Sequence, residues 1–336
     1  MAQSVDSSQT DTTKNLHLTV MPYLSYNRNM DFLIGVIPMA MYRLNKSDTI
    51  SSKSLSGVSA VYTTNESYFL AFFNQWYFSE NKWRIQLFGL TGNYNSQFYV
   101  ADFAPPSFYD YNTELTYISL SVKRRIIENL FGGITYNYGY YDTEYEDNIQ
   151  PQSITETNGI KLQLQLDTRD DFYYPRKGKR AIVEWTTFQE WFWNDETANK
   201  IKTEYIHYFP SRQNRDVFAA RFSGIYGLGN IAFQQQETIG GKDIRGYSEG
   251  KYRGDGIISL QGEYRFNFAN RMGAIGYIGM ATIYGSDNTD FNWKAYPGVG
   301  LGYRYKAFKD ENFNIGLDGA LGKDDWGVYF RIGEAF

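Results

Sequence analysis

Residues 160–167 read Ile-Lys-Leu-Gln-Leu-Gln-Leu-Asp, and this stretch decides the fold class. Successive side chains of a β-strand point to opposite faces, so Ile160 and the three leucines share one face, while Lys161, the glutamines and Asp167 share the other. The same alternation returns at 258–268 and at 328–332. Strands that are apolar on one face and polar on the other therefore predict an all-β protein.

Working outward from this stretch, the alternation predicts 16 strands along the whole chain. The segments in the first half are 17–27, 30–43, 54–63, 67–78, 82–93, 114–126, 129–142 and 154–169. The segments in the second half are 178–191, 199–209, 214–228, 255–268, 271–285, 292–306, 312–321 and 325–334.

Strand length and loop length distinguish two architectures. A soluble β-sandwich would also alternate, but many of these segments have 11 residues or more, whereas strands usually have about 5–6 and tilted membrane strands about 9–11. Long connections (94–113, 143–153, 229–254) follow odd-numbered strands, and short turns (127–128, 269–270) follow even-numbered ones, as in outer-membrane barrels. We therefore predict a 16-stranded antiparallel transmembrane outer-membrane β-barrel in which half of each strand faces a wet lumen.

Composition excludes several classes of function. The chain of 336 residues has no Cys, two His, a formal net charge of −4, and 30 Tyr, 24 Phe and 7 Trp. The missing cysteines exclude a disulfide scaffold, a thiolate metal cage and a Cys nucleophile. An acidic chain offers no field that would attract nucleic acid. No stretch reaches the ~20 mainly apolar residues of a membrane helix, whereas abundant aromatic side chains suit the interfacial girdles of a barrel.

Known catalytic patterns are missing from the sequence. There is no serine-hydrolase elbow, Walker loop, zinc-protease motif or calcium-loop motif, so we expect no enzyme activity, no metal and no cofactor. Residues 1–15 are polar and are expected to be a disordered mature N-terminus. Residues 16–336 are expected to form the barrel as one domain.

The connection 229–254 carries the most informative motif. It contains Ile244-Arg245-Gly246-Tyr247 and joins the eleventh and twelfth predicted strands. This loop resembles the Val-Arg-Gly-Phe/Tyr loop of the BamA/TamA superfamily, the outer-membrane insertase and translocase barrels that are also called bacterial surface antigens. The resemblance implies that this long extracellular loop folds back into the lumen, where Arg245 would pair with a carboxylate of the barrel wall. Glu263, on the inward face of the twelfth strand, is the expected partner.

Three other stretches carry the same resemblance, which runs from about residue 160 to the end. The segment between strands eight and nine is similar to the family's D-x-R-D…P-x-x-G turn, and we expect it to brace the barrel. The stretches 262–266 and 297–304 resemble the family's twelfth and fourteenth strands. Gly279 stands where the family usually has Asp, so Arg245 would pair with Glu263 alone or with another carboxylate. The residues of the turn motif are Asp167, Arg169, Asp170, Pro175 and Gly178.

The resemblance also implies a function at the junction of the first and last strands. The first strand begins near residue 17, which leaves no room for the POTRA domains of the family, so a barrel-only member is expected in the outer membrane of a Gram-negative bacterium. Pro22 in the first strand cannot donate a ladder hydrogen bond, and glycines weaken the last strand. We expect a weak seam that helps proteins, or lipid, to insert or translocate. The residues assigned to this seam are Pro22, Gly327, Gly333 and Phe336.

Two other functions remain open. The polar inward face would suit a passive diffusion pore, and a barrel of this kind could also be one subunit of a larger outer-membrane assembly. The expected partners are the lipid bilayer, client outer-membrane proteins or an accessory periplasmic or outer-membrane subunit. Nucleic acid is not expected.

Overall fold

The computed structural model describes residues 16–27, 30–51, 53–100, 106–171, 174–240, 243–248, 250–306 and 314–336. The predicted N-terminal tail, residues 1–15, lies outside the described residues. Within the described part the chain is almost entirely β, with helical structure limited to short 3-10 turns. None of these helical turns is long and apolar enough to cross a membrane. The all-β class is therefore confirmed.

The strands are long and follow the predicted segments closely. The first half contains β1 (Leu16–Asn27), β2 (Asp31–Tyr42), β3 (Ser54–Thr63), β4 (Tyr68–Phe78), β5 (Trp83–Val100), β6 (Ser107–Ile127), β7 (Leu130–Tyr145), η1 (Glu146–Asn148), β8 (Ser153–Asp167), β9 (Gly178–Phe188) and η2 (Glu190–Phe192).

The second half adds two short strands within the long connection. It contains β10 (Ala198–Ser211), β11 (Asp216–Gly229), η3 (Phe233–Gln235), β12 (Glu237–Thr238), β13 (Arg253–Gly254), β14 (Gly256–Asn267), β15 (Met272–Tyr284), η4 (Thr289–Phe291), β16 (Tyr296–Lys306), β17 (Asn314–Gly322) and β18 (Asp325–Ile332).

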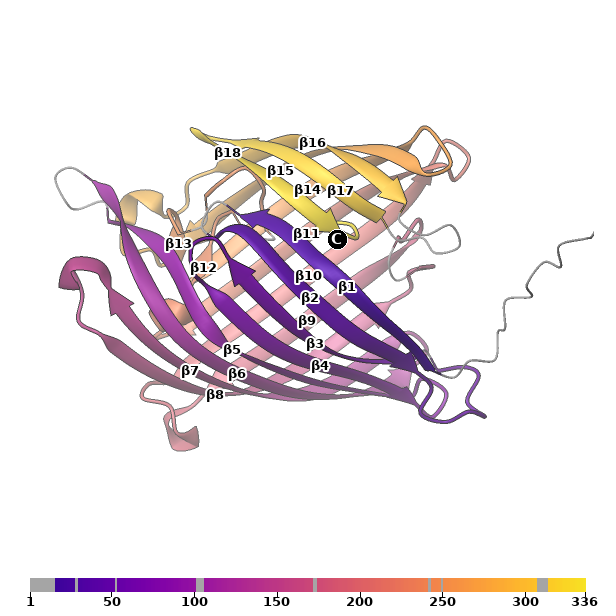
Figure 1. Cartoon of the computed structure of the whole chain (residues 1–336), viewed down its shortest axis with the longest axis horizontal. Coiled ribbons are helices and arrows are strands. Elements are labelled where there is room, and N and C mark those ends of the chain that lie inside the picture. Colours follow the sequence, from indigo (N-terminus) through magenta and orange to yellow (C-terminus); the bar gives the residue numbers. More distant parts are fainter. Residues whose placement is uncertain are drawn as a thin grey trace, which may run out of the picture.

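One large antiparallel sheet joins all the long strands. Its order is β1 to β11 and then β14 to β18, so every strand pairs with its neighbours along the chain, and β12 and β13 form a separate two-stranded ribbon. The sheet curves strongly, and β18 returns beside β1 (Figure 1). Among the described residues, hydrogen-bonded ladders join consecutive strands of the sheet, and none joins β1 to β18. The two end strands therefore approach each other as free edges.

The hairpin β5–β6 is longer than predicted. The sequence pattern predicts a loop over residues 94–113, but the ladder continues from the Asn93–Glu114 pair out to Val100 and Ser107. Aromatic packing explains the extension, because Phe98 and Tyr111 are buried in a cluster with Tyr145 and Phe233. Phe233 belongs to the connection between β11 and β14, so a contact distant in sequence lengthens these strands.

The two faces of the sheet differ in the way that a membrane wall requires. On the outer face, large apolar side chains such as Leu162, Val183 and Leu301 are exposed. On the inner face of β8 to β17, buried polar and charged side chains predominate, as the alternation predicted. The inner residues of this group include Gln163, Gln165, Glu204, Arg221, Gln261, Glu263, Arg265, Arg304 and Asp318.

The prediction of a wet inner face is wrong for β2 to β4. Their outer residues, such as Ile34 and Leu70, are exposed and apolar, but inner residues such as Ile37, Val61 and Phe69 are apolar as well and line one hollow. The cause is visible in 32–42, which is a continuous apolar run rather than an alternating one. Strands of this kind present apolar side chains on both faces.

Candidate functional site

Residues 230–255 connect β11 to β14, and their described part (230–240, 243–248 and 250–255) lies against the inner face of the sheet. On one side, Gln234 Nε2 donates a 3.0 Å hydrogen bond to Thr143 Oγ1 of β7, and Phe233 packs in the β5–β7 aromatic cluster. On the other side, the amide of Gly246 donates to the hydroxyl of Tyr329 of β18 at 2.9 Å. The loop therefore crosses the interior from the middle strands to the last strand, as the resemblance implied.

Arg245 is at the centre of this arrangement. Its Nη2 lies 3.0 Å from Glu263 Oε2 of β14, and its Nη1 lies 2.8 Å from Asp318 Oδ2 of β17. The Arg245 side chain is 2% exposed and both carboxylates are fully buried. The guanidinium also lies 3.3 Å from the centroid of the Tyr277 ring. A planar guanidinium can bridge two carboxylates and stack on a ring at once, which an ammonium cannot do.

Arg245 and three other arginines form one ionic cluster with three carboxylates. Arg265 Nε lies 2.9 Å from Glu263 Oε1, Arg304 pairs with Asp318, and Arg331 Nε of β18 lies 2.8 Å from Asp318 Oδ2. Glu334 joins through Arg304 Nε at 3.0 Å. Because buried charges are costly unless they are paired and hydrogen-bonded, removal of any central member leaves others uncompensated. The ionic cluster therefore ties the loop, β14, β16, β17 and β18 together.

Glycines on β16 make room for the ionic cluster. A Cβ on Gly300 would lie 2.2 Å from the hydroxyl of Tyr277, and one on Gly302 would lie 2.1 Å from Asp318 Oδ1. Gly279, which stands where the family has Asp, would likewise meet Ile244 Cδ1 at 2.8 Å. The alternating glycines of 298–302 are therefore explained by space, because they let neighbouring side chains and the loop backbone occupy the inner face.

The residues beside Arg245 hold the loop by packing and by hydrogen bonds. Ile244 and Tyr247 are buried in a cluster with Ile257, Ile283 and Tyr296. The hydroxyl of Tyr247 donates to the carbonyl of Pro297 at 2.6 Å and accepts from the amide of Lys323 at 3.0 Å. Burial raises the pKa of the Tyr247 hydroxyl, so it remains a neutral donor. Gly246 has φ +104°, and a Cβ there would lie 2.6 Å from the carbonyl carbon of Leu321.

We expect Tyr247→Phe to destabilise the protein by about 1–3 kcal/mol, because the Lys323 amide and the Pro297 carbonyl lose their buried partner. The change is measured as a lower midpoint of urea unfolding in detergent micelles. Tyr252→Phe is the matched control, since Tyr252 packs in the same cluster and the described structure shows no hydrogen bond from its hydroxyl. Equal midpoints for the two variants would contradict the assignment.

The turn motif between β8 and β9 forms a compact braced corner. Arg169 donates two hydrogen bonds to Asp167, at 2.8 and 2.7 Å, and Asp170 Oδ1 accepts the amides of Arg176 and Lys177. Gly178 has φ +96°, where a side chain would be strained, and its Cβ would also strike the Thr168 carbonyl. The carbonyl of Pro175 faces Arg265 of the ionic cluster at 3.5 Å. The motif thus joins β8 to β9 and contacts the ionic cluster in the interior.

The structure does not bring the four residues assigned to the seam together at the β1–β18 junction. Pro22 lies in β1 opposite Val36, and Gly327 lies in β18. Gly333 was placed in the last strand, but β18 ends at Ile332 and Gly333 turns the chain with φ +82°.

Phe336 lies away from the β1–β18 edge. It packs inside against the buried cluster that contains Tyr174 and Tyr208, and its carbonyl accepts from Arg265 at 2.5 Å. The cause is electrostatic, since Glu334 turns inward to Arg304 and Asn314 and carries the following residues with it.

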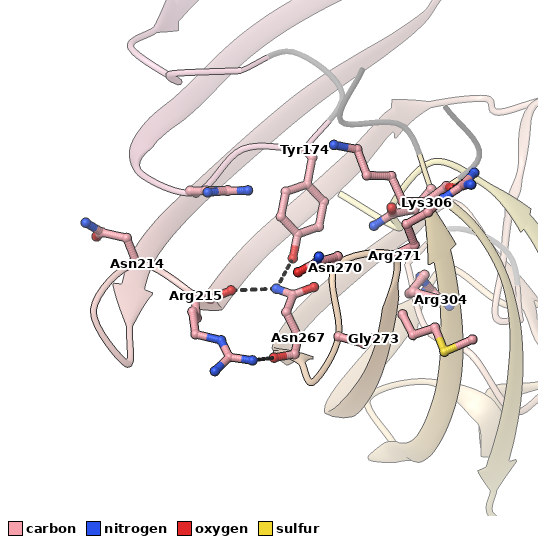
Figure 2. Close-up of a pocket in the computed structure, with 13 residues that line it drawn as sticks. Tyr174, Asn214, Arg215, Asn267, Asn270, Arg271, Gly273, Arg304 and Lys306 are labelled. Atoms are coloured by element: carbon pink, nitrogen blue, oxygen red, sulfur yellow. Dashed lines mark hydrogen bonds between the residues drawn. The ribbon is translucent and has the colours of Figure 1, made fainter. Parts of the chain in front are cut away.

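A positively charged hollow of about 460 Å³ lies at the end of the interior where the short turns gather. Figure 2 shows Asn267 at its edge, bonded to the hydroxyl of Tyr174 at 3.0 Å and to the carbonyl of Arg215 at 2.6 Å. Among the described residues that line it there is no carboxylate. The cations that line it are Arg176, Arg215, Arg271, Arg304 and Lys306.

Sequence reasoning identified Arg245 and Glu263 and missed Asp318. The signal was present, because Asp318 is the one charged residue in the β17 sequence Asn-Ile-Gly-Leu-Asp-Gly-Ala-Leu-Gly and falls on its inner face. What the sequence could not show is that residues 245 and 318 meet across 73 positions. Among the described residues, no group of three His, Asp or Glu side chains is arranged to hold a metal ion.

These features together define a class of protein. Long antiparallel strands, an apolar outer face and a polar inner face covered by a loop are features of an outer-membrane β-barrel. The sequence profile of the Omp85 superfamily domain matches residues 53–336, and the chain belongs to this superfamily of insertion and translocation barrels.

Solved structures show the same fold at low sequence identity. BamA from Haemophilus ducreyi lacking POTRA domains 1–3 superposes with a TM-score of 0.66 at 11% identity, over 95% of this chain and 70% of that one. CdiB from Escherichia coli gives 0.67 at 10% identity, over 95% and 67%. CdiB from Acinetobacter baumannii gives 0.62 at 14% identity, over 95% and 60%. This chain therefore spans between 60% and 70% of the length of these three structures. No curated protein matches the sequence.

Proposed function

We propose that the chain forms a closed 16-stranded barrel in the outer membrane and assists the insertion or translocation of proteins, or of lipid, through the junction of β1 and β18. Membership of the Omp85 superfamily supports this proposal. The fold shared with BamA and CdiB supports it as well. The partners would be the lipid bilayer and unfolded outer-membrane proteins, with an accessory periplasmic or outer-membrane subunit as a further candidate. We propose no enzymatic step.

The observation that carries the proposal is how β18 is held. Gly246 and Ser248 of the loop bond to Tyr329 and Asp325, and Arg331 pairs with Asp318, so β18 is fixed from the inside. Its outer edge faces β1 without a ladder among the described residues. A strand that is held from behind and unpaired at its edge can offer backbone hydrogen bonds to a client strand. The ionic cluster would keep β18 in place while β1 moves away.

The experiment measures how fast an unfolded eight-stranded outer-membrane barrel folds into liposomes that contain the purified protein. Because the chain has no Cys, β1 and β18 can be locked by a disulfide between one cysteine in β1 and one in the stretch of β18 that faces it across the junction. We expect the protein to accelerate folding, the lock to abolish the acceleration, and a reductant to restore it. A locked protein that still accelerates folding would rule out the seam.

The matched control is a lock in a part of the wall that the proposal leaves closed. Tyr205 of β10 and Phe222 of β11 are direct cross-strand partners, and both are exposed on the outer face. A disulfide at this pair should leave the acceleration unchanged. Loss of activity in both locked proteins would indicate a general effect of the disulfide on the barrel.

A passive pore is the second candidate, and the cation-lined hollow at the short-turn end favours it. The loop lies across the interior, so a pore should conduct weakly in planar bilayers and conduct more, with selectivity for anions, once residues 231–252 are removed. A silent bilayer before and after the deletion would exclude this function.

A further inference from the structure

The inner face of the first strands carries a hollow that the ionic cluster does not use. Its volume is about 500 Å³, within the range of small-molecule sites, and every strand from β1 to β6 contributes to its lining. The lining is apolar or aromatic apart from the hydroxyl groups of Ser59 and of the two tyrosines. We call it the apolar groove, and its principal residues are Tyr23, Leu33, Ile37, Val61, Phe69 and Leu115.

The wall behind the apolar groove is almost without charge. The sequences of β1 to β4 contain no Lys, Arg or Glu, and a single Asp at the first position of β2. On the outer face of the same strands, Phe32, Ile34 and Leu70 are more than half exposed. This part of the sheet therefore presents apolar side chains on both faces, whereas the inner face of β14 to β17 carries the ionic cluster.

The described part of the loop leaves this groove open. On this side of the interior, Phe233 packs on Phe98 and Tyr111, and Gly250 and Lys251 contact Tyr99. None of these three partners lines the groove. Tyr94 marks the boundary, because it lines the groove and also contacts Tyr111 at 6.1 Å between ring centroids. Leaving such a surface in water costs about 25 cal/mol per Å² of apolar area, so an apolar occupant would be favoured.

The chemistry of the wall selects the kind of occupant. The backbone N–H and C=O groups of β2 to β4 lie in the plane of the sheet, and most are within ladders to their neighbours. The ladder between β2 and β3 is interrupted at Ile37 and Pro38. A peptide strand lying in the groove would find side chains there and no backbone partners, and its own amide groups would be desolvated at a cost of several kcal/mol each. A hydrocarbon chain has no such groups. An acyl chain therefore fits the groove, and an extended peptide does not.

We propose that the apolar groove binds an acyl chain of a membrane lipid. The groove lies beside the end of the sheet, since Tyr23 of β1 lines it and the other edge of β1 faces β18 without a ladder among the described residues. The charged side of the interior would then face water or a client, and the apolar side would be covered by lipid. This site extends beyond the proposed function, because its occupancy requires neither a client nor catalysed insertion.

The test uses tryptophan fluorescence in bilayers of phosphatidylcholine with brominated acyl chains, compared with bilayers of dioleoylphosphatidylcholine. Bromine quenches tryptophan on contact. The signal is the tryptophan emission of Phe69→Trp minus that of wild type. In the brominated bilayer this signal should fall by at least about half, because the indole ring would contact the brominated acyl chain in a groove from which water is excluded. Tyr94→Trp, a milder change in the same groove, provides the second reading.

Two controls set the scale of this experiment. Thr135 lies on the inner face of β7 among polar side chains. The emission of Thr135→Trp should therefore be similar in the two bilayers, and any quenching that remains measures the effect of bromine across the sheet. Ile34→Trp on the outer face should be quenched fully. The proposal would be overturned if the emission of Phe69→Trp and of Tyr94→Trp is quenched no more than that of Thr135→Trp. That outcome would not affect the proposal for the β1–β18 junction. A negative result in the folding assay would likewise not affect the proposal that the groove binds an acyl chain.

Discussion

Replacing Arg245 with alanine will destabilise the protein by about 3–5 kcal/mol, the range found when one partner of a buried ion pair is removed. The substitution leaves Glu263 and Asp318 without their shared cation, and both carboxylates are fully buried. It also removes the guanidinium from the Tyr277 ring. The measurement is urea unfolding in detergent micelles, together with the loss of heat-modifiable migration on gels that reports an assembled barrel.

The matched control for this prediction is an ion pair at the surface. Lys82 and Glu80 lie 3.2 Å apart with more than half of each side chain exposed, and such pairs contribute about 0–1 kcal/mol. Lys82→Ala should therefore leave unfolding almost unchanged. Arg245→Lys should fall between the two, because one ammonium cannot serve both carboxylates in the same geometry. If Arg245→Ala behaves like Lys82→Ala, the loop is not held by this residue.

Gly300→Ala is the second large effect that we expect. The added methyl group would lie 2.2 Å from the Tyr277 hydroxyl and 2.3 Å from the carbonyl oxygen of Gly319. The hydroxyl belongs to a ring that supports Arg245, and the carbonyl is backbone of the neighbouring strand, so neither can move freely. Overpacking of this kind costs about 1–3 kcal/mol or more, and the same unfolding assay measures it.

Gly319→Ala is the matched control. Gly319 lies on β17 opposite Leu301 of β16, and a Cβ at Gly319 would have no other atom within 4 Å. We expect its unfolding midpoint to remain within experimental error of wild type. The contrast between two glycines on adjacent strands separates the loss of space from the general effect of replacing glycine in a sheet. Similar losses in both variants would show that space around Tyr277 is not the cause.

The sequence predicted the wall of this protein better than its interior. Alternation at 160–167 and 258–268 was sufficient for the strands, because one-sided burial has a period of two. The run 32–42 explains why β2 is apolar on both faces, but the alternation elsewhere predicts a wet inner face for every strand, and the apolar groove was not predicted.

Contacts between distant segments could not be predicted in the same way. Asp318 meets Arg245 only because β17 lies three strands from β14 in the sheet, and no spacing in the chain encodes that approach. The inward course of 333–336 depends on Glu334 reaching Arg304 and Asn314. Such pairings follow from the register of the whole sheet, which single-segment patterns do not contain.

The loop's position on the inner face of β18 is the claim on which the seam mechanism depends, and a disulfide tests it directly. Ser248 Oγ lies 3.3 Å from Asp325 Oδ1, so Ser248→Cys with Asp325→Cys should crosslink readily in intact outer membranes. Ser248→Cys with Glu80→Cys, whose second member lies in the β4–β5 turn at the opposite end of the sheet, should not. We predict an efficient crosslink for the first pair and none for the second. Absence of the first crosslink, with Ser248→Cys labelled freely by a membrane-impermeant reagent, would contradict the account.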